Sequence, residues 1–318
     1  MTAQQSPAPN AVIFDLGGVV LQWDPRRAFA QVLPEHEIDP LMQRIDFPRW
    51  NHQQDLGRSF EDAEAELRQR FPDDAEAVAG YREHFGHTLT GMVPGTSAVI
   101  AELDRAGVRL AALTNWSAET FPLARKRFGI LNRFAGIVVS GTEGLGKPDP
   151  EIFELTVRRH DLDASRTVFV DDSPANVEAA ERAGLIAVHF TDSGTLRARL
   201  QQLGLLESPN PLSQKVFHIA EAGHWNAALA GDGYPWSARG VGYEAEGFVH
   251  ASFAHQLPGV LDRYWADADW SDLVLLELDT DRAPIVLEAP GPDAEPYPHL
   301  YAELTPELVA HSHQGVQG

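Results

Sequence analysis

Residues 11–20, AVIFDLGGVV, constrain the fold of this chain more than any other segment. Four apolar residues precede Asp15, and two glycines follow one residue later. An uninterrupted apolar run of this length is typical of a strand buried on both faces, as in a parallel sheet. Open sheets of this kind bind ligands at the carboxyl ends of their strands. Asp15 is therefore either a nucleophile or metal ligand at that edge, or a residue that caps a turn.

Composition limits the classes of function. The chain has 318 residues, a formal net charge of -21 and no cysteine. The missing cysteines exclude disulfides and thiol chemistry, and the negative charge argues against nucleic acid and anionic membranes as partners. The N-terminal MTAQQSPAPN has no apolar signal core, and no apolar run is long enough to span a membrane. We therefore expect a soluble, cytoplasmic protein, and the sequence predicts no particular oligomeric state.

Residues 24–90 predict a helical insertion. Helix-like segments such as FEDAEAELRQRF follow one another, separated by prolines, and Ser59 with Asp62 is typical of a helix start. No strand pattern interrupts them. The length of this stretch favours a separate helical cap over a part of the helical layer that covers the sheet.

Further apolar runs resume the α/β alternation. Residues 108–114, 136–140, 167–170 and 186–190 read as strands, with helical segments between them. Polar residues follow at or just beyond three of these strands: Thr114 and Asn115, Lys147 in GLGKPDP, and Asp171 with Asp172. Because the carboxyl ends of parallel strands share one edge, we expect these groups to converge with Asp15.

Such a set of side chains suits phosphoryl transfer. We predict that Asp15 attacks phosphorus and that Thr114, Asn115 and Lys147 hold the phosphate oxygens. Carboxylate oxygens are the ligands that Mg²⁺ prefers, so the predicted cofactor is Mg²⁺. Asp171 and Asp172 supply negative charge for this cation, and Asp15 is a further candidate ligand.

The ordered motifs FDLGGV, LTN, GKPDP and VDDSPANVEAA resemble the haloacid dehalogenase superfamily, in the branch with a helical cap after the first strand. The resemblance covers about residues 11–192. It implies a Rossmann-like core, a mobile cap and an aspartyl-phosphate intermediate. The residues that match the four motifs of the family are Asp15, Thr114, Lys147, and Asp171 with Asp172.

One position departs from this pattern. Phosphatases of the family carry a second Asp, the general acid, where this chain has Gly17; the carbonyl of Gly17 still offers a metal ligand. The residues that we consider as replacements are Asp24, His52 and His84. The departure leaves two alternatives to a phosphatase: a dehalogenase that forms its ester at carbon, or a phosphate-binding protein without turnover. The adjacent Asp171 and Asp172 favour a cation, and with it the phosphatase.

The cap is expected to select the substrate. Aromatic and amide side chains suit a sugar phosphate or another small phosphorylated metabolite, which is the predicted partner. Four residues are candidates for facing the site, with a place in the cap core as the alternative: Trp23, Trp50, Asn51 and His52.

The chain changes character after residue 205. Residues 206–214 are expected to be a linker, and strands outnumber helices in residues 215–311, which predicts a small α+β domain. From residue 212 onward, four basic residues face sixteen acidic ones, which argues against nucleic-acid binding. The polar candidates there are His218, His250, Ser252, His299 and Tyr301. No close metal-ligand spacing joins the three histidines, so a structural role is favoured over a metal site.

This second part resembles family 952 of domains of unknown function, on the segments FHIA, EGFVHAS, LVLLELD and PHLYAEL. The resemblance covers about residues 216–309. It implies a fold similar to that of ADP-ribosyltransferases, which bind NAD between two sheets, with His218, His250 and Tyr301 at the site. A bifunctional protein is the resulting alternative. The full expectation is a hydrolase domain at 11–205, with its core at 11–22 and 92–205, and an α+β domain at 215–311.

Overall fold

The computed structural model describes residues 8–207, 214–290 and 294–314. By internal contacts the chain divides into two compact units. The first comprises 1–93, 107–127 and 131–206, and the second comprises 94–106, 128–130 and 207–318. The second unit thus includes α6 (Thr96–Arg105), which the sequence-based division assigned to the hydrolase core. Most of the predicted linker, 208–213, lies outside the described residues.

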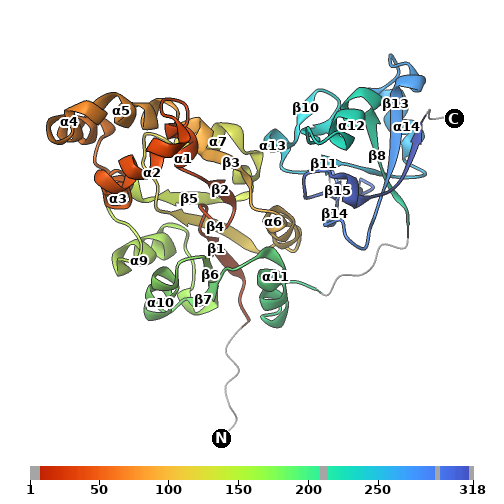
Figure 1. Ribbon diagram of the computed structural model, residues 1–318. Coiled ribbons are helices and arrows are strands. Elements are labelled where there is room, and N and C mark those ends of the chain that lie inside the picture. The colour runs from red at the N-terminus through yellow and green to blue at the C-terminus, as the bar shows by residue number, and fades with distance from the viewer. Residues whose placement is uncertain (1–7, 208–213, 291–293, 315–318) are drawn as a thin grey trace, which may run out of the picture. The chain divides into compact units, whose positions relative to one another are not determined.

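A five-stranded parallel sheet forms the centre of the first unit (Figure 1). Its order is β5-β4-β1-β6-β7, and Phe14 of β1 lies beside Ala112 of β4 and Val170 of β6. The strands are β1 (Ala11–Phe14), β4 (Arg109–Thr114), β5 (Gly136–Val139), β6 (Thr167–Asp171) and β7 (Ile186–His189). The central strands β1 and β6 are buried along their whole length. The predicted Rossmann-like α/β core is confirmed.

Helices cover this sheet and close its core. They are α7 (Phe121–Arg127), α8 (Ser140–Glu143), α9 (Pro150–Arg159), α10 (Pro174–Arg182) and α11 (Ser193–Gln202). Phe153 of α9 packs edge-on against Phe169 of β6, with ring centroids 5.2 Å apart. Pro150 and Pro174 stand in the first turns of α9 and α10, where the missing N–H costs no helical hydrogen bond. These helix starts lie just beyond the sheet edge that carries the site.

The cap is helical. It consists of α1 (Arg26–Phe29), α2 (Glu35–Arg44), α3 (Phe47–Asp55), α4 (Phe60–Arg70) and α5 (Ala75–Glu83). Its core is a cluster of rings around the fully buried Tyr81, whose partners are Phe29, Phe47, Trp50, Phe60 and Phe85. Ser59 accepts a hydrogen bond from the Asp62 N–H at the start of α4, as its position in the sequence predicts.

An antiparallel ribbon that the sequence did not predict joins the cap to the core. It pairs β2 (Leu21–Trp23) with β3 (Leu89–Met92), so the chain enters and leaves the cap along two adjacent strands. Strands of three and four residues are too short to show the alternation from which strands are predicted. The ribbon carries Trp23 at the end of β2.

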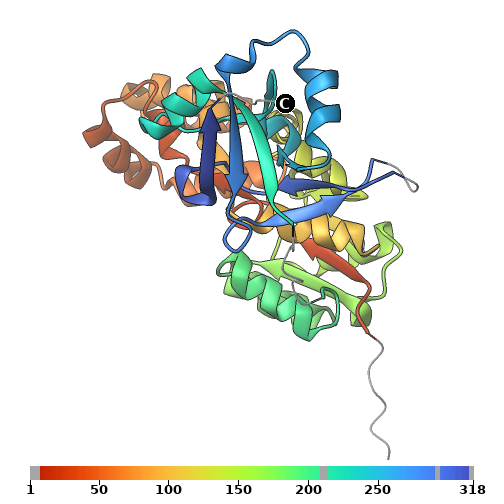
Figure 2. The ribbon, with the colours of Figure 1, turned by 90° about the vertical axis from the view of Figure 1, so that its right-hand side faces the viewer.

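The second unit contains two main antiparallel sheets. Figure 2 faces this unit and shows β8 in teal beside β13 and β16 in blue. The four-stranded sheet is β12 (Ser252–Phe253), β8 (Val216–Glu221), β13 (Leu273–Leu278) and β16 (Val309–Gln314); the three-stranded sheet is β11 (Val249–His250), β15 (Tyr297–Leu300) and β14 (Ile285–Glu288). Besides α6, this unit contains α12 (Ala222–Leu229), α13 (Tyr243–Glu246), α14 (Leu257–Tyr264), and the pair β9 (Trp236–Ala238) with β10 (Val241–Gly242). The predicted small α+β domain is confirmed.

Strand boundaries in this unit differ from those that the sequence pattern predicts. The alternation in GFVHAS predicts one strand at 247–252, but the structure has two short strands, β11 and β12, separated at Ala251. The segment HLYAEL predicts a strand at 299–304, but β15 ends at Leu300, and nothing in the sequence predicts β16. Beyond Val309, β16 reads AHSHQ and is exposed, so it carries no apolar alternation.

A search of the described residues for membrane-spanning helices finds none with the required length and apolar character.

Candidate active site

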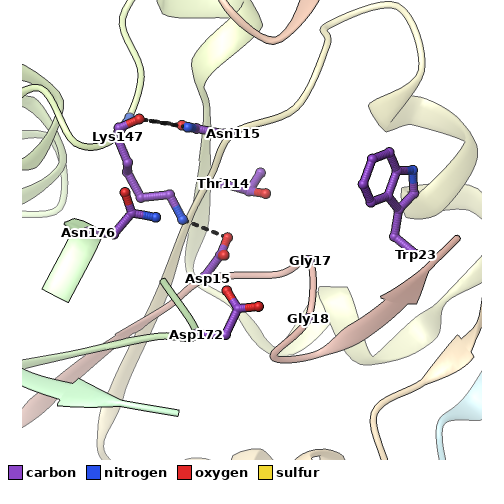
Figure 3. A pocket seen from close by; sticks show the side chains of 9 residues that line it. All are labelled: Asp15, Gly17, Gly18, Trp23, Thr114, Asn115, Lys147, Asp172 and Asn176. Carbon is purple, nitrogen blue, oxygen red and sulfur yellow. Dashed lines mark hydrogen bonds and ion pairs between the residues drawn. The ribbon is translucent and has the colours of Figure 1, made fainter. Parts of the chain in front are cut away.

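The sheet edge gathers the predicted polar residues. Asp15 follows β1, Thr114 ends β4, Asp171 ends β6, and Lys147 lies in the loop before α9. Figure 3 shows the side chain of Lys147 reaching down to Asp15, with Asp172 below them and Trp23 across the gap. The convergence follows from the parallel register, since three neighbouring strands end at this edge.

Lys147 bridges the two innermost carboxylates. Its Nζ lies 2.7 Å from Asp15 Oδ1 and 2.7 Å from Asp171 Oδ2. The side chain of Lys147 is 1% exposed, and that of Asp171 is fully buried. Charges removed from water to this degree are stable only when they are paired, so the three groups form one electrostatic unit.

Asn115 fixes the loop that carries Lys147. Its amide nitrogen donates to the Lys147 carbonyl at 2.8 Å, and its amide oxygen accepts from the Lys147 N–H at 2.8 Å. This pair of bonds ties the end of β4 to the loop before α9. These bonds position the main chain of Lys147, and with it the ammonium group, at the edge of the sheet.

Asn176 orients Asp171 and was missed by the sequence analysis. Asp171 Oδ1 accepts from the Ser173 N–H and from the Asn176 amide, each at 2.9 Å. The other oxygen, Oδ2, is left to Lys147. The signal was present in VDDSPANVEAA, because the first turn of a helix that starts beside a carboxylate points side chains back toward it.

Burial and neighbouring charges shift the pKa values of the site. Burial is the main cause that raises the pKa of Asp15 to about 7, with Asp171 adding to the shift and Lys147 opposing it. Burial also raises the pKa of Asp172, and the charge of Asp171 acts in the same direction. Burial disfavours the charge of Lys147, but the carboxylates of Asp15 and Asp171 outweigh it, so the pKa of Lys147 is raised. Burial of the carboxyl groups is thus the main reason that the pKa values of Asp15 and Asp172 are raised.

Three carboxylates stand close enough to share one cation. Asp15, Asp171 and Asp172 each offer an oxygen, and these oxygens all lie within 4.8 Å of one another. No other such group of His, Cys, Asp or Glu occurs among the described residues. An all-oxygen set of this kind fits a hard cation such as Mg²⁺.

A cavity of about 290 Å³ opens onto these groups. Its lining residues are Asp15, Gly17, Gly18, Trp23, Thr114, Asn115, Lys147, Asp172 and Asn176. Gly18 needs to be glycine on two counts. Its φ of +77° is unfavourable for other residues, and a Cβ would stand 2.3 Å from Asp172 Oδ2.

Of the cap residues considered, only Trp23 lines the cavity. Trp50 belongs to the aromatic core of the cap, and the Asn51 amide donates to Asp55. The residues considered as replacement acids, which are not among the cavity-lining residues, are Asp24, His52 and His84. Asp24 accepts a hydrogen bond from the Arg26 N–H at the start of α1.

In the second unit, three of the five polar candidates lie together. His250 and His299 face each other across β11 and β15, with ring centroids 5.0 Å apart, and Glu288 accepts from both His299 and Tyr301. His218 is hydrogen-bonded to the main-chain carbonyl of His250 and to the Tyr234 hydroxyl. Burial lowers the pKa of His218 to about 4. The fifth candidate, Ser252, is buried in β12.

Comparisons with known proteins match two parts of the chain to families. The haloacid dehalogenase-like hydrolase family matches residues 9–184, and a family of unknown function, DUF952, matches residues 219–312. The chain is a hydrolase. It belongs to the haloacid dehalogenase-like family, and its second part matches DUF952.

Individual relatives agree with this assignment. A sesquiterpene phosphatase of Aspergillus oryzae is 31% identical over 207 residues, which cover 61% of this chain and 96% of that protein. A phosphoglycolate phosphatase of Vibrio cholerae is 30% identical over 111 residues, covering 35% of this chain and 49% of that protein. Among solved structures, the magnesium complex of a haloacid dehalogenase family enzyme of Bacteroides thetaiotaomicron is 19% identical, with a TM-score of 0.48; the match covers 62% of this chain and all of that one.

Proposed function

We propose that this protein is a Mg²⁺-dependent phosphatase that hydrolyses a small phosphorylated metabolite through an aspartyl phosphate. The observation that carries the proposal is the position of Lys147 Nζ, which lies 2.7 Å from both Asp15 and Asp171 at the sheet edge onto which the cavity opens. The ammonium group held there neutralises an incoming phosphate, and Asp15, one of the two carboxylates at the cavity wall, is placed to act as the nucleophile.

Each polar group then has a role. Asp15 attacks phosphorus, Thr114 and Lys147 bind the phosphate oxygens, and Asn115 keeps Lys147 in place through its two bonds to the main chain. Asn176 holds Asp171 so that its second oxygen stays with Lys147. Water then attacks the phosphorus of the aspartyl phosphate and restores the Asp15 carboxylate.

Mg²⁺ fits the residues present. Asp15, Asp171 and Asp172 would hold it, with the Gly17 carbonyl as a further ligand. When bound, the ion would neutralise charge on the phosphate. The carboxylate cluster supports this assignment, because three carboxylates stand together and Lys147 is the one ammonium group among the cavity-lining residues. The same excess of carboxylate favours the phosphatase over the dehalogenase alternative, in which no cation takes part.

The relatives support the enzyme class. Both named relatives are phosphatases, and their names state small organic substrates. The acidic second part, with four basic and sixteen acidic residues, supports a small metabolite over nucleic acid as the partner. The family that matches the second part has no stated function, so we assign none to it.

The test is phosphate release from sugar phosphates, nucleotides and 4-nitrophenyl phosphate, measured for the wild type and for Asp15→Asn, each with Mg²⁺ and with EDTA. The expected result is turnover that needs both Asp15 and Mg²⁺. Turnover that persists in Asp15→Asn or in EDTA would contradict the proposal, as would the absence of release from every compound.

A further inference from the structure

Each ionisable side chain that lines the cavity already has a role in the proposed function other than proton donation to the leaving group. Three of the nine lining residues ionise: Asp15, Lys147 and Asp172. In the proposed function Asp15 attacks the phosphorus, Lys147 binds between two carboxylates, and Asp172 holds the metal. None of them is left to give a proton to the departing oxygen of the substrate.

The uncharged lining residues do not replace such an acid. Thr114, Asn115 and Asn176 carry hydroxyl and amide groups that do not release protons near neutral pH. The indole N–H of Trp23 is a hydrogen-bond donor that does not ionise. Within the described residues, the cavity wall therefore offers no general acid.

Gly17 marks open space at this wall. It lines the cavity, its φ lies outside the left-handed region, and a Cβ built there would meet nothing within 4 Å. The loop therefore leaves room beside Asp15 that no protein side chain fills. A leaving group in this space faces main chain and solvent.

Trp23 forms the opposite wall and presents a flat apolar surface. Its side chain is 41% exposed although it touches the aromatic core of the cap, where its ring stacks on Phe47 at 6.4 Å. The ring packs against Phe47 on one side and lies across the cavity from Asp15 (Figure 3). It is the only aromatic side chain among the lining residues.

We propose that this site is selective for phosphate monoesters whose leaving group is a flat, resonance-stabilised oxyanion, such as a phenolate. The proposal rests on the proposed function. Asp15 forms a bond to phosphorus, the bond from phosphorus to the ester oxygen breaks, and its electron pair leaves with that oxygen as an anion. Water then attacks the phosphorus, both of its protons end on the released phosphate, and Asp15 is again a carboxylate.

The chemical reason is the stability of the leaving group. A phenol has a pKa of about 10, so its anion departs without a proton, whereas an alkoxide resembles hydroxide, whose parent water has a pKa of about 15.7. General acid catalysis typically contributes about 10²- to 10⁴-fold, and a site without it forfeits that factor on alkyl esters. The leaving group stacks on Trp23 while it departs.

The first test measures kcat/KM for substituted phenyl phosphates and for alkyl esters, glycerol phosphate and glucose 6-phosphate, with Asp15→Asn as the control. The expected result is a steep fall of kcat/KM with rising leaving-group pKa, with alkyl esters at least about 10²-fold below phenyl phosphate. Equal rates for alkyl and aryl esters would overturn this inference and leave the phosphatase intact. If the wild type hydrolyses none of these esters, the proposed function fails and this inference fails with it.

The second test adds the missing acid. Gly17→Asp and Gly17→Asn introduce side chains of the same size into the open space, and only the first carries a proton to donate. We expect the ratio of kcat/KM between these two variants to exceed about 10 for glycerol phosphate and to stay near 1 for 4-nitrophenyl phosphate. An equal ratio for the two substrates would overturn the inference.

The third test concerns Trp23. Trp23→Leu should raise KM for phenyl phosphate by about 2- to 10-fold, as expected for the loss of one ring stack, while kcat changes little. Trp23→Phe should recover part of the loss. Trp270, which is 39% exposed and lies in the second unit, provides the control Trp270→Leu. The same KM effect in the control would remove Trp23 from the substrate site.

Discussion

Replacing Lys147 by Met keeps the length of the side chain and removes its charge. Asp15 and Asp171 then face each other without the ammonium group that now lies 2.7 Å from each of them. Breaking a buried ion pair from one side typically costs about 3–5 kcal/mol, because the remaining charge stays buried without a partner. For a unit of about 150–250 residues, each kcal/mol lowers the unfolding temperature by about 2–4 °C. We therefore expect the first unit to unfold about 6–20 °C lower.

The size of this effect depends on pH. Lys147 is one of the groups that hold the pKa of Asp15 down, so without it the carboxyl protonates at still higher pH. A buried carboxyl whose pKa is higher in the folded protein than in the unfolded protein favours the folded state at low pH. This contribution to stability is lost as the pH rises from the unfolded-state pKa through the folded-state pKa. The loss caused by Lys147→Met is therefore expected to be larger at pH 8 than at pH 6.

Thermal unfolding in EDTA-containing buffer, followed by circular dichroism or calorimetry, measures both effects. The matched control is Lys126→Met, because Lys126 is exposed on α7. An unfolding temperature within about 2 °C of this control at pH 8 would refute the argument. It would mean that Lys147 does not compensate the two buried carboxylates.

Three further predictions concern Gly18, the binding of Mg²⁺ at Asp171, and His218. Gly18→Ala should lower the unfolding temperature and the response to Mg²⁺ more than Gly107→Ala; both glycines have positive φ, at a cost of about 1–3 kcal/mol, but only at Gly18 does a Cβ meet Asp172. Calorimetry with and without Mg²⁺ tests this, and equal losses would contradict it. Mg²⁺ should raise the unfolding temperature of the wild type but not of Asp171→Asn, because the variant lacks one carboxylate of the cluster; an equal rise in both would contradict the assigned ligand. The second unit should lose up to about 3 kcal/mol as pH falls from about 6.5 to about 4, since His218 takes up a proton only when unfolded. In His218→Gln that pH dependence of unfolding should vanish, and its persistence would assign it to another group.

The sequence was most informative where strands end. Asp15, Thr114 and Asp171 each follow an apolar run, and a parallel sheet brings the ends of such runs together whatever the rest of the chain does. Lys147 was predicted from its loop, but its contacts with two carboxylates were not. Side-chain contacts between segments far apart in the sequence leave no local pattern.

The same limit explains why Asn176 was missed and why the place of Trp23 was left open. Asn176 acts through a hydrogen bond to Asp171, and Trp23 faces the site because the short ribbon of β2 and β3 turns it there. Four residues were predicted either to face the site or to form the cap core. The packing of the aromatic core decides between these two places, since Trp50 packs inside it whereas Trp23 lines the cavity. Such packing depends on the whole cap rather than on any one segment.

The most direct measurement of the central claim is to trap the phosphoryl group on the protein. The wild type is mixed with 4-nitrophenyl phosphate and Mg²⁺, quenched in acid within one turnover, digested and analysed by mass spectrometry, with Asp15→Asn in parallel. The proposed function predicts one phosphoryl group on the peptide that contains Asp15, and none in the variant. Turnover with no trapped phosphoryl group, or with one on another residue, would contradict the assignment of Asp15 as the nucleophile.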